Sequence, residues 1–231
     1  MEANTRDIVR LGWARHLRLA DEALTSADPG AGPVRVESET TAMVVRLFDH
    51  VVLVGPDWLH DRAAALDPLT LSEQSALLRC CDGHPARLVG ESVLAYTDSY
   101  VRAAGLAEVP VSDEPELMGA LEQACPPDDV TEVGLGRMFQ ALVVLDDADS
   151  PQAGAGYAEW QGILGQLGVL TPPALRRSGH GRTAASLAVN DALDSGLVPQ
   201  WRARVGNTAS RRLGRSLGLT EVGTQTTVRL S

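Results

Sequence analysis

The sequence predicts an α/β (α+β) protein whose sheet has mixed strand direction. Short valine-rich runs alternate with longer segments in which apolar residues recur about every 3.6 positions, the pattern of strands between amphipathic helices. Glycine and proline clusters separate these segments, as expected at turns. With 231 residues and 44% hydrophobic content, the chain is long enough for one large domain or two small ones.

The first 102 residues are predicted to form a mixed α/β accessory domain. The expected elements are helices at 7–24, 56–66 and 70–81, strands at 34–38, 42–48 and 51–56, and a strand followed by a short helix at 86–104. Thr70 and Glu73 have the spacing of a capping box. The histidines are too widely spread for a metal site, and adjacent Cys80 and Cys81 fit buried thiols better than a disulfide framework.

The pattern restarts at residue 103, where a second domain, 103–231, is predicted to begin. The expected elements are a strand at 106–112, a helix at 113–124, strands at 138–147, 153–160 and 163–170, a helix ending at Gly196, a strand at 198–206, a helix at 207–218, and a hairpin or strand pair at 219–230. The polar turn between 138–147 and 153–160 predicts an antiparallel pair. The proline-containing segment 125–129 is predicted to break the helix before it.

Charge is unevenly distributed along the chain. The net charge is −10, all 20 basic residues are arginine, and residues 176–215 carry +6, which leaves −16 for the remainder. A basic island in an acidic chain suits a pocket for a small polyanion, whereas overall acidity and few aromatic residues argue against nucleic acid. No apolar run is long enough for a membrane span, and the N-terminus has no apolar signal core, so a cytoplasmic protein without a membrane partner is expected.

The arginine- and glycine-rich turn at residues 176–183 is the one segment that indicates chemistry. It precedes a predicted helix, whose N-terminus offers unpaired N–H groups and a partial positive charge to an anion. Gly179 and Gly181 permit close approach and positive φ, and Arg176, Arg177 and Arg182 add positive charge. The turn can therefore hold a pyrophosphate. By itself it also fits an ordinary strand-to-helix turn, and it lacks the P-loop lysine.

Three elements in this order and spacing resemble the GNAT superfamily of N-acetyltransferases. They are the apolar strand at 163–170, the turn Arg176-x-x-Gly179-x-Gly181, and the segment 207–219 with Asn207, Ser210, Leu217, Gly218 and Leu219. The resemblance covers residues 103–231 and implies a mixed, mostly antiparallel sheet with flanking helices. The first 102 residues would then be an accessory domain or a decayed second copy of the same fold.

The resemblance implies acetyl-CoA as cosubstrate and no metal. The residues that would contact its pyrophosphate are Arg176, Arg177, Ser178, Gly179, His180, Gly181, Arg182 and Thr183. The strand 166–170 would diverge from its neighbour, and the main chains of Leu167, Val169 and Leu170 would meet the pantetheine arm. Asn207 and Ser210 would lie beside the pantetheine and thioester, although Asn207 is also a plausible helix cap.

Direct acetyl transfer needs a group to deprotonate the amine and a proton for the departing thiolate. At the positions where the family often has a glutamate and a tyrosine, this chain has Ile163, Gly165 and Gly214. We therefore expect Glu159, and next Glu132, as the candidate general base; each also fits a solvated loop carboxylate. Water, Tyr157 or Ser210 would help the thiolate leave, and Tyr157 and Trp160 would wall the acceptor pocket or belong to the core.

The function implied is an N-acetyltransferase acting on a small-molecule amine such as an amino acid, an antibiotic or a biosynthetic intermediate. The acidic remainder of the chain favours a cationic acceptor. Two alternatives stay open: acetylation of a protein N-terminus or lysine, and a non-catalytic CoA-binding sensor or structural module, which the glycine at position 214 favours. By resemblance, the chain is also expected to form a homodimer.

Overall fold

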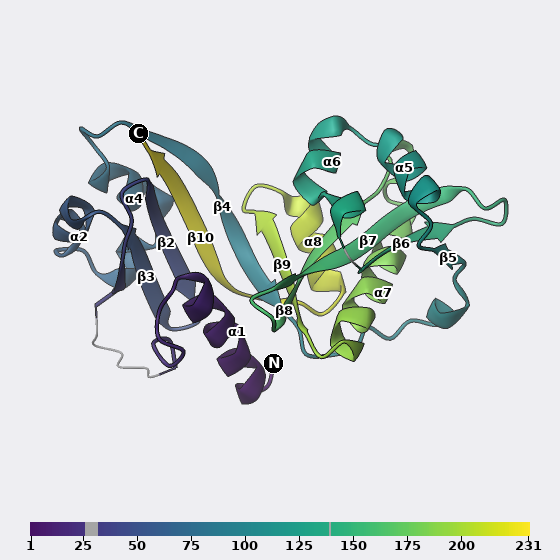
Figure 1. Ribbon diagram of the computed structural model, residues 1–231, viewed down its shortest axis with the longest axis horizontal. Helices are drawn as coiled ribbons and strands as arrows, with labels where there is room; N and C mark the ends of the chain where they lie inside the picture. Colours follow the sequence, from purple (N-terminus) through teal and green to yellow (C-terminus); the bar gives the residue numbers. More distant parts are fainter. Residues whose placement is uncertain (26–31, 139) are drawn as a thin grey trace. The chain divides into compact units, whose positions relative to one another are not determined.

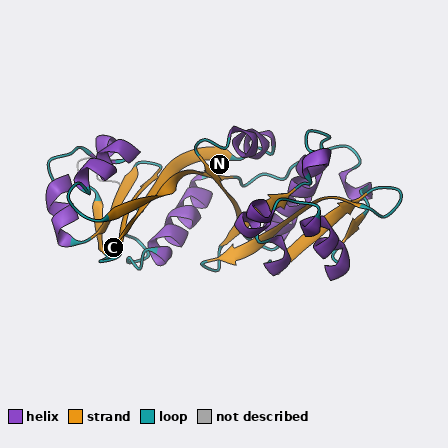
Figure 2. Ribbon diagram, turned by 90° about the horizontal axis from the view of Figure 1, so that it is seen from above, coloured by secondary structure: helices purple, strands orange, loops and turns teal. Residues whose placement is uncertain are grey.

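The computed structural model describes residues 1–25, 32–138 and 140–231. Within them the chain divides into two compact units (Figure 1). Unit 1 comprises Met1–Thr5, Tyr96–Trp201 and Arg212–Thr220, and unit 2 comprises Arg6–Ala95, Arg202–Arg211 and Glu221–Ser231. In both units helices lie against strands that are mostly antiparallel (Figure 2), which confirms the predicted fold class.

Unit 2 is built on strands in the order β1-β3-β2-β10-β4. Their bounds are β1 Val34–Glu37, β2 Thr41–Leu47, β3 His50–Gly55, β4 Ala86–Tyr96 and β10 Thr220–Leu230. The prediction of a hairpin at 219–230 is wrong, because β10 is one continuous strand along β2. Gly223 lies within β10 opposite Leu47 and allows the backbone of Arg46 to approach closely, rather than making a turn.

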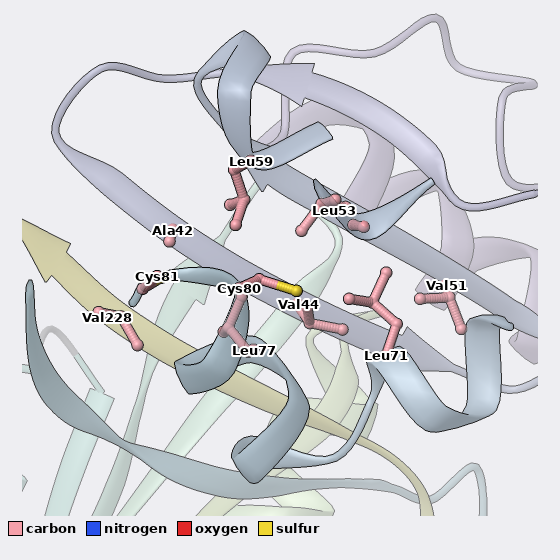
Figure 3. Close-up of a cluster of buried hydrophobic side chains, with 11 residues drawn as sticks. Ala42, Val44, Val51, Leu53, Leu59, Leu71, Leu77, Cys80, Cys81 and Val228 are labelled. Carbon is pink, nitrogen blue, oxygen red and sulfur yellow. The ribbon is translucent and has the colours of Figure 1, made fainter. Parts of the chain in front are cut away.

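The core of unit 2 forms where short helices pack on β2, β3 and β10 (Figure 3). The helices that contribute to this core are α2 Asp57–Ala63, α3 Pro68–Leu71 and α4 Gln74–Cys80. The remaining described helix among the first 95 residues is α1 Ala3–His16. Leu59, Leu71 and Leu77 from the helices contact strand residues such as Val44 and Leu53. Cys80 and Cys81 are buried free thiols, as predicted, and burial raises the pKa of both.

The start of α3 differs from the predicted capping box. Asp67, not Thr70, is the N-cap: its carboxylate accepts the backbone N–H of Leu69 and of Thr70, and the Thr70 hydroxyl also donates to it. Pro68 occupies the first helical position, where a proline is favoured. The helix therefore begins before Thr70, and Glu73 precedes the separate helix α4.

Unit 1 contains strands in the order β9-β8-β7-β6-β5. Their bounds are β5 Val111–Ser112, β6 Gln140–Leu145, β7 Pro151–Trp160, β8 Leu164–Leu170 and β9 Val198–Arg204, of which residues 202–204 fall in unit 2. The predicted antiparallel pair is confirmed as β6 and β7, although Phe139 lies outside the described residues. The pairing of β8 with β9 is parallel.

Helices cover both faces of the unit 1 strands. They are α5 Pro115–Gln123 and α6 Pro127–Val133 on one face, α7 His180–Asp194 on the other, and α8 Thr208–Ser216, which crosses the unit boundary. Gly168 of β8 faces Val133 of α6, whereas Gly165, three residues earlier, faces Ala192 of α7. Because side chains alternate along a strand, the two helices lie on opposite faces.

Of two predictions about connecting segments, one is confirmed. The segment 125–129 breaks the helix before it, since α5 ends at Gln123 and Pro127 begins a separate helix, α6, which was not predicted. The short helix expected within 97–104 does not form. There the Asn190 side chain of α7 accepts the N–H of Val101 at 2.8 Å and donates to its carbonyl at 3.0 Å, so these groups do not bond within a helix.

Residues 221–230 of β10 belong to unit 2, which also contains residues 6–95, because β10 pairs with β2. The boundary predicted between residues 102 and 103 therefore differs from the division between the two units, and independent domains 1–102 and 103–231 stay a prediction. Among the described residues, none of the helices is long and apolar enough to cross a membrane.

Candidate functional site

The N-terminus of α7 directly follows the arginine- and glycine-rich turn. Gly179 is the N-cap, with left-handed φ 94° and ψ −20°, and no side chain caps the helix. The N–H groups of Arg182 and Thr183 both bond to the Gly179 carbonyl. The first N–H groups of a helix have no acceptor within the helix, so an uncapped start can bind an anion.

The two glycines of the turn have different structural roles. A Cβ on Gly179 would meet nothing within 4 Å, so only its positive φ favours glycine there. A Cβ on Gly181 would lie 2.7 Å from Oγ1 of Thr171, just after β8. Arg177 also has positive φ, 70°, which is unusual for a side chain of its size. The backbone thus reverses sharply and brings the start of α7 close to the end of β8.

Two of the three arginines of the turn have partners in the protein. Nη2 of Arg176 lies 2.6 Å from Oδ2 of Asp129 in α6, and its Nε donates to the Thr171 carbonyl. Nη2 of Arg182 donates to the Ser216 carbonyl at 3.2 Å. Arg177 is exposed. The Arg176–Asp129 pair is half exposed, and such pairs contribute about 1 kcal/mol or less, so a bound phosphate could compete for Arg176.

The strand β8 pairs fully with β7 but only partly with β9. The β7 ladder continues to Leu170, whereas the β9 ladder comprises Leu164↔Val198, Gly165↔Pro199 and Gln166↔Gln200. In the described part of the chain, no strand pairing is recorded for 167–170 on the β9 side. This is the divergence that the resemblance implies. Backbone groups that have no ladder partner can bond an extended ligand.

A buried polar chain lies where the β8–β9 ladder ends. The Tyr96 hydroxyl donates to Oε1 of Gln200 at 2.7 Å, and Nε2 of Gln200 donates to Oε1 of Gln166 at 2.7 Å. Nε2 of Gln166 in turn donates to the Leu167 carbonyl. Tyr96 and Gln200 are fully buried. Gln166 thus satisfies a main-chain acceptor at the point of divergence. Sequence reasoning missed these residues, because Tyr96 and Gln200 lie 104 positions apart.

Tyr157 faces α7. Its hydroxyl donates to Oδ2 of Asp191 at 2.7 Å and lies 2.9 Å from Oγ of Ser195. Burial, followed by the neighbouring Asp191 carboxylate, raises the pKa of Tyr157 above its ordinary value, although its bond to Ser195 acts in the opposite direction. At neutral pH the phenol keeps its proton and fixes β7 against the helix.

The structure does not bring the two candidate carboxylates together. Glu159 is exposed near the end of β7, two residues after Tyr157 and therefore on the α7 face. Glu132 is exposed on α6, which covers the opposite face. Trp160 is half-buried at the end of β7. Each glutamate still fits either of its two predicted roles, a general base or a solvated carboxylate.

The segment 207–219 has its expected local structure. Oδ1 of Asn207 accepts the Ser210 N–H at 3.0 Å, so Asn207 caps α8, and Gly218 ends the helix with φ 86°. Asn207 and Ser210 belong to unit 2. In unit 1, a Cβ on Gly214 would lie 3.4 Å from the Trp201 ring. The Trp201 indole thus covers the position where the family often has a tyrosine.

Among the residues that the structure describes, no group of three or more His, Cys, Asp or Glu side chains could hold a metal ion. The site consists instead of backbone amides, arginines and an open strand edge. This is the donor set expected for a phosphorylated, extended ligand.

No family model and no curated protein matches the sequence. Solved structures do match. A GCN5-related N-acetyltransferase from Kribbella flavida has TM-score 0.50 at 21% identity, covering 67% of this chain and 63% of that one. A GNAT-family structure from Novosphingobium aromaticivorans has TM-score 0.48 at 22% identity, covering 63% and 68%. The match to the Kribbella protein thus spans less than two thirds of its length. The protein has the GNAT fold.

Proposed function

We propose that the protein transfers the acetyl group of acetyl-CoA to the amine of a small molecule. The observation that carries the proposal is the succession of two features in unit 1: β8 separates from β9 after Gln166, and α7 then begins, uncapped, at a left-handed Gly179. The open edge of β8 suits an extended pantetheine arm, and the helix N-terminus suits a pyrophosphate.

The residues present fit acetyl-CoA. A Cβ at Gly181 would occupy space beside Thr171, and Arg177 adds an exposed positive charge at the turn. The main chains of Leu167, Val169 and Leu170 would meet the pantetheine, and residues 176–183 the phosphates. Asn207 and Ser210 would contact the cofactor by resemblance alone. The cosubstrate itself supplies an activated acetyl thioester.

The reaction requires two proton movements around this thioester. The acceptor nitrogen forms a bond to the acetyl carbon and loses a proton, and the carbon–sulfur bond breaks to give a thiolate that gains one. Glu159 is the first candidate to take the amine proton, and Glu132 is the second. Both side chains are exposed. Gly214 has no side chain that could donate a proton, and the Tyr157 hydroxyl donates to Asp191, so water or Ser210 would supply the proton to the thiolate.

A non-catalytic CoA-binding module is the second candidate function. The packing of Gly214 under Trp201 favours it, because no side chain at this position can donate a proton. Acetylation of a protein N-terminus remains a third possibility. The strongly acidic remainder of the chain suits a cationic acceptor.

Thiol release from acetyl-CoA in the presence of a panel of small amines tests the proposal. We expect turnover with at least one amine, and a decrease of about 100-fold in kcat for Glu159→Gln or Glu132→Gln, the usual contribution of a general base. CoA affinity, measured by calorimetry, should stay within about twofold in both variants. CoA binding without turnover would support the non-catalytic module, and no CoA binding would overturn both functions.

A further inference from the structure

A cavity of about 270 Å³ lies in unit 1 beside the middle of α7, and the site described above does not use it. Its walls come from β5, β6, β7 and α7. Three alanines, Ala141, Ala155 and Ala188, contribute apolar surface. Asp113 and Asp191 are exposed, whereas Tyr157 is buried, so the carboxylates lie where the cavity meets solvent and its inner part is mostly apolar.

The cavity is separate from the proposed cofactor site. Ala188 and Asp191 lie eight and eleven residues after His180, or roughly 12 and 16 Å along the helix axis. The lining strands are β5 to β7, whereas the open edge of β8 is on its β9 side. The strand β8 therefore lies between the β7 wall of the cavity and the proposed path of the pantetheine arm.

Among the described residues, neither Asp113 nor Asp191 forms an ion pair. Asp191 and Asp194 lie in the last turns of α7, where the helix dipole is negative, and the last turn has no basic residue. Each carboxylate accepts a tyrosine hydroxyl at 2.7 Å, Asp191 from Tyr157 and Asp194 from Tyr100, and no ion pair to either is recorded.

The residues that line the cavity indicate which kind of ligand it can bind. Two carboxylates beside a small apolar interior suit a positive head group with a short hydrocarbon body. A metal ion is a poorer fit, because no cluster of three candidate ligands occurs in the described chain. The volume lies just below the usual range of ligand pockets, which begins at about 300 Å³, so the ligand must be small.

We propose that this cavity binds a primary alkylammonium ion, with its nitrogen between the carboxylates of Asp113 and Asp191 and its alkyl chain against the three alanines. A neutral compound of the same shape should not bind, because it cannot compensate the two negative charges. The proposal does not depend on acetyl transfer.

Calorimetric titration with n-butylammonium chloride and with n-butanol, at low ionic strength and without CoA, tests this site. We expect saturable binding of the ammonium ion alone. Asp191→Asn and Asp113→Asn should each weaken binding at least about tenfold. Asparagine at 191 can still accept the Tyr157 hydroxyl, so the fold should persist, which circular dichroism can verify.

Asp194→Asn is the matched control, because it removes the same charge from the same helix but Asp194 does not line the cavity. Its affinity for the ammonium ion should stay within about twofold of the unmodified protein. Equal binding of the alcohol, equal weakening by Asp194→Asn, or no saturable binding up to about 50 mM would overturn the proposal.

Discussion

Replacing Gly179 with aspartate is expected to weaken CoA binding about 100-fold, or roughly 2.8 kcal/mol. A Cβ at this position meets nothing within 4 Å, so the change adds a negative charge beside the uncapped start of α7 without a steric clash. One charge about 6 Å from a phosphate costs roughly 2.8 kcal/mol at an effective dielectric constant of about 20. Isothermal titration with CoA measures the change.

Gly179→Asn provides the matched control for this prediction. Asparagine and aspartate have the same shape, and both adopt left-handed backbone more readily than other side chains. The asparagine variant should therefore lose only about threefold in CoA affinity. Equal affinities in the two variants would show that no phosphate lies near Gly179.

Replacing Gly156 with alanine should lower the free energy of unfolding by about 3 kcal/mol, at the upper end of overpacking effects. Gly156 lies in β7 opposite Ala141 of β6. A Cβ there would overlap the Gln140 carbonyl oxygen and lie 2.8 Å from both Cα and Cβ of Ala141. Because most of these atoms are backbone, the two strands must separate. Urea unfolding measures the loss.

The control for this change is Gly119→Ala. Gly119 lies inside α5, and a Cβ there meets nothing within 4 Å. Alanine favours helix over glycine by about 1 kcal/mol, so this variant should be at least as stable as the unmodified protein. A Gly156→Ala variant with unchanged stability would contradict the close strand approach on which the sheet of unit 1 depends.

The sequence predicted elements whose signals are local. Three such elements depend on a few consecutive residues: the turn before α7, the antiparallel pair β6 and β7, and the Asn207 cap of α8. Where prediction failed, a distant partner or an ambiguous residue decided the outcome. Asn190 holds residue 101 out of a helix. Pro127 begins α6, a helix that was not predicted, although the break before it was.

In the candidate site, too, neighbouring residues could be predicted and contacts between distant residues could not. The residues of the turn at 176–183 could be identified because they are contiguous. The pairing of Arg176 with Asp129 joins positions 47 apart, and the chain from Tyr96 through Gln200 to Gln166 joins three strands. Nothing in the sequence indicates which of many polar residues will meet in this way. Alternation along a strand predicts that Tyr157 and Glu159 share one face of β7. It does not predict that α7 covers this face.

The most direct test of the central claim is a two-dimensional ¹H–¹⁵N spectrum of the protein titrated with CoA. If the start of α7 holds the phosphates, the amide signals of His180 and Gly181 should shift more than those elsewhere in α7, and they should saturate with the calorimetric affinity. Binding of CoA that leaves these two signals unmoved, or no binding, would contradict the account.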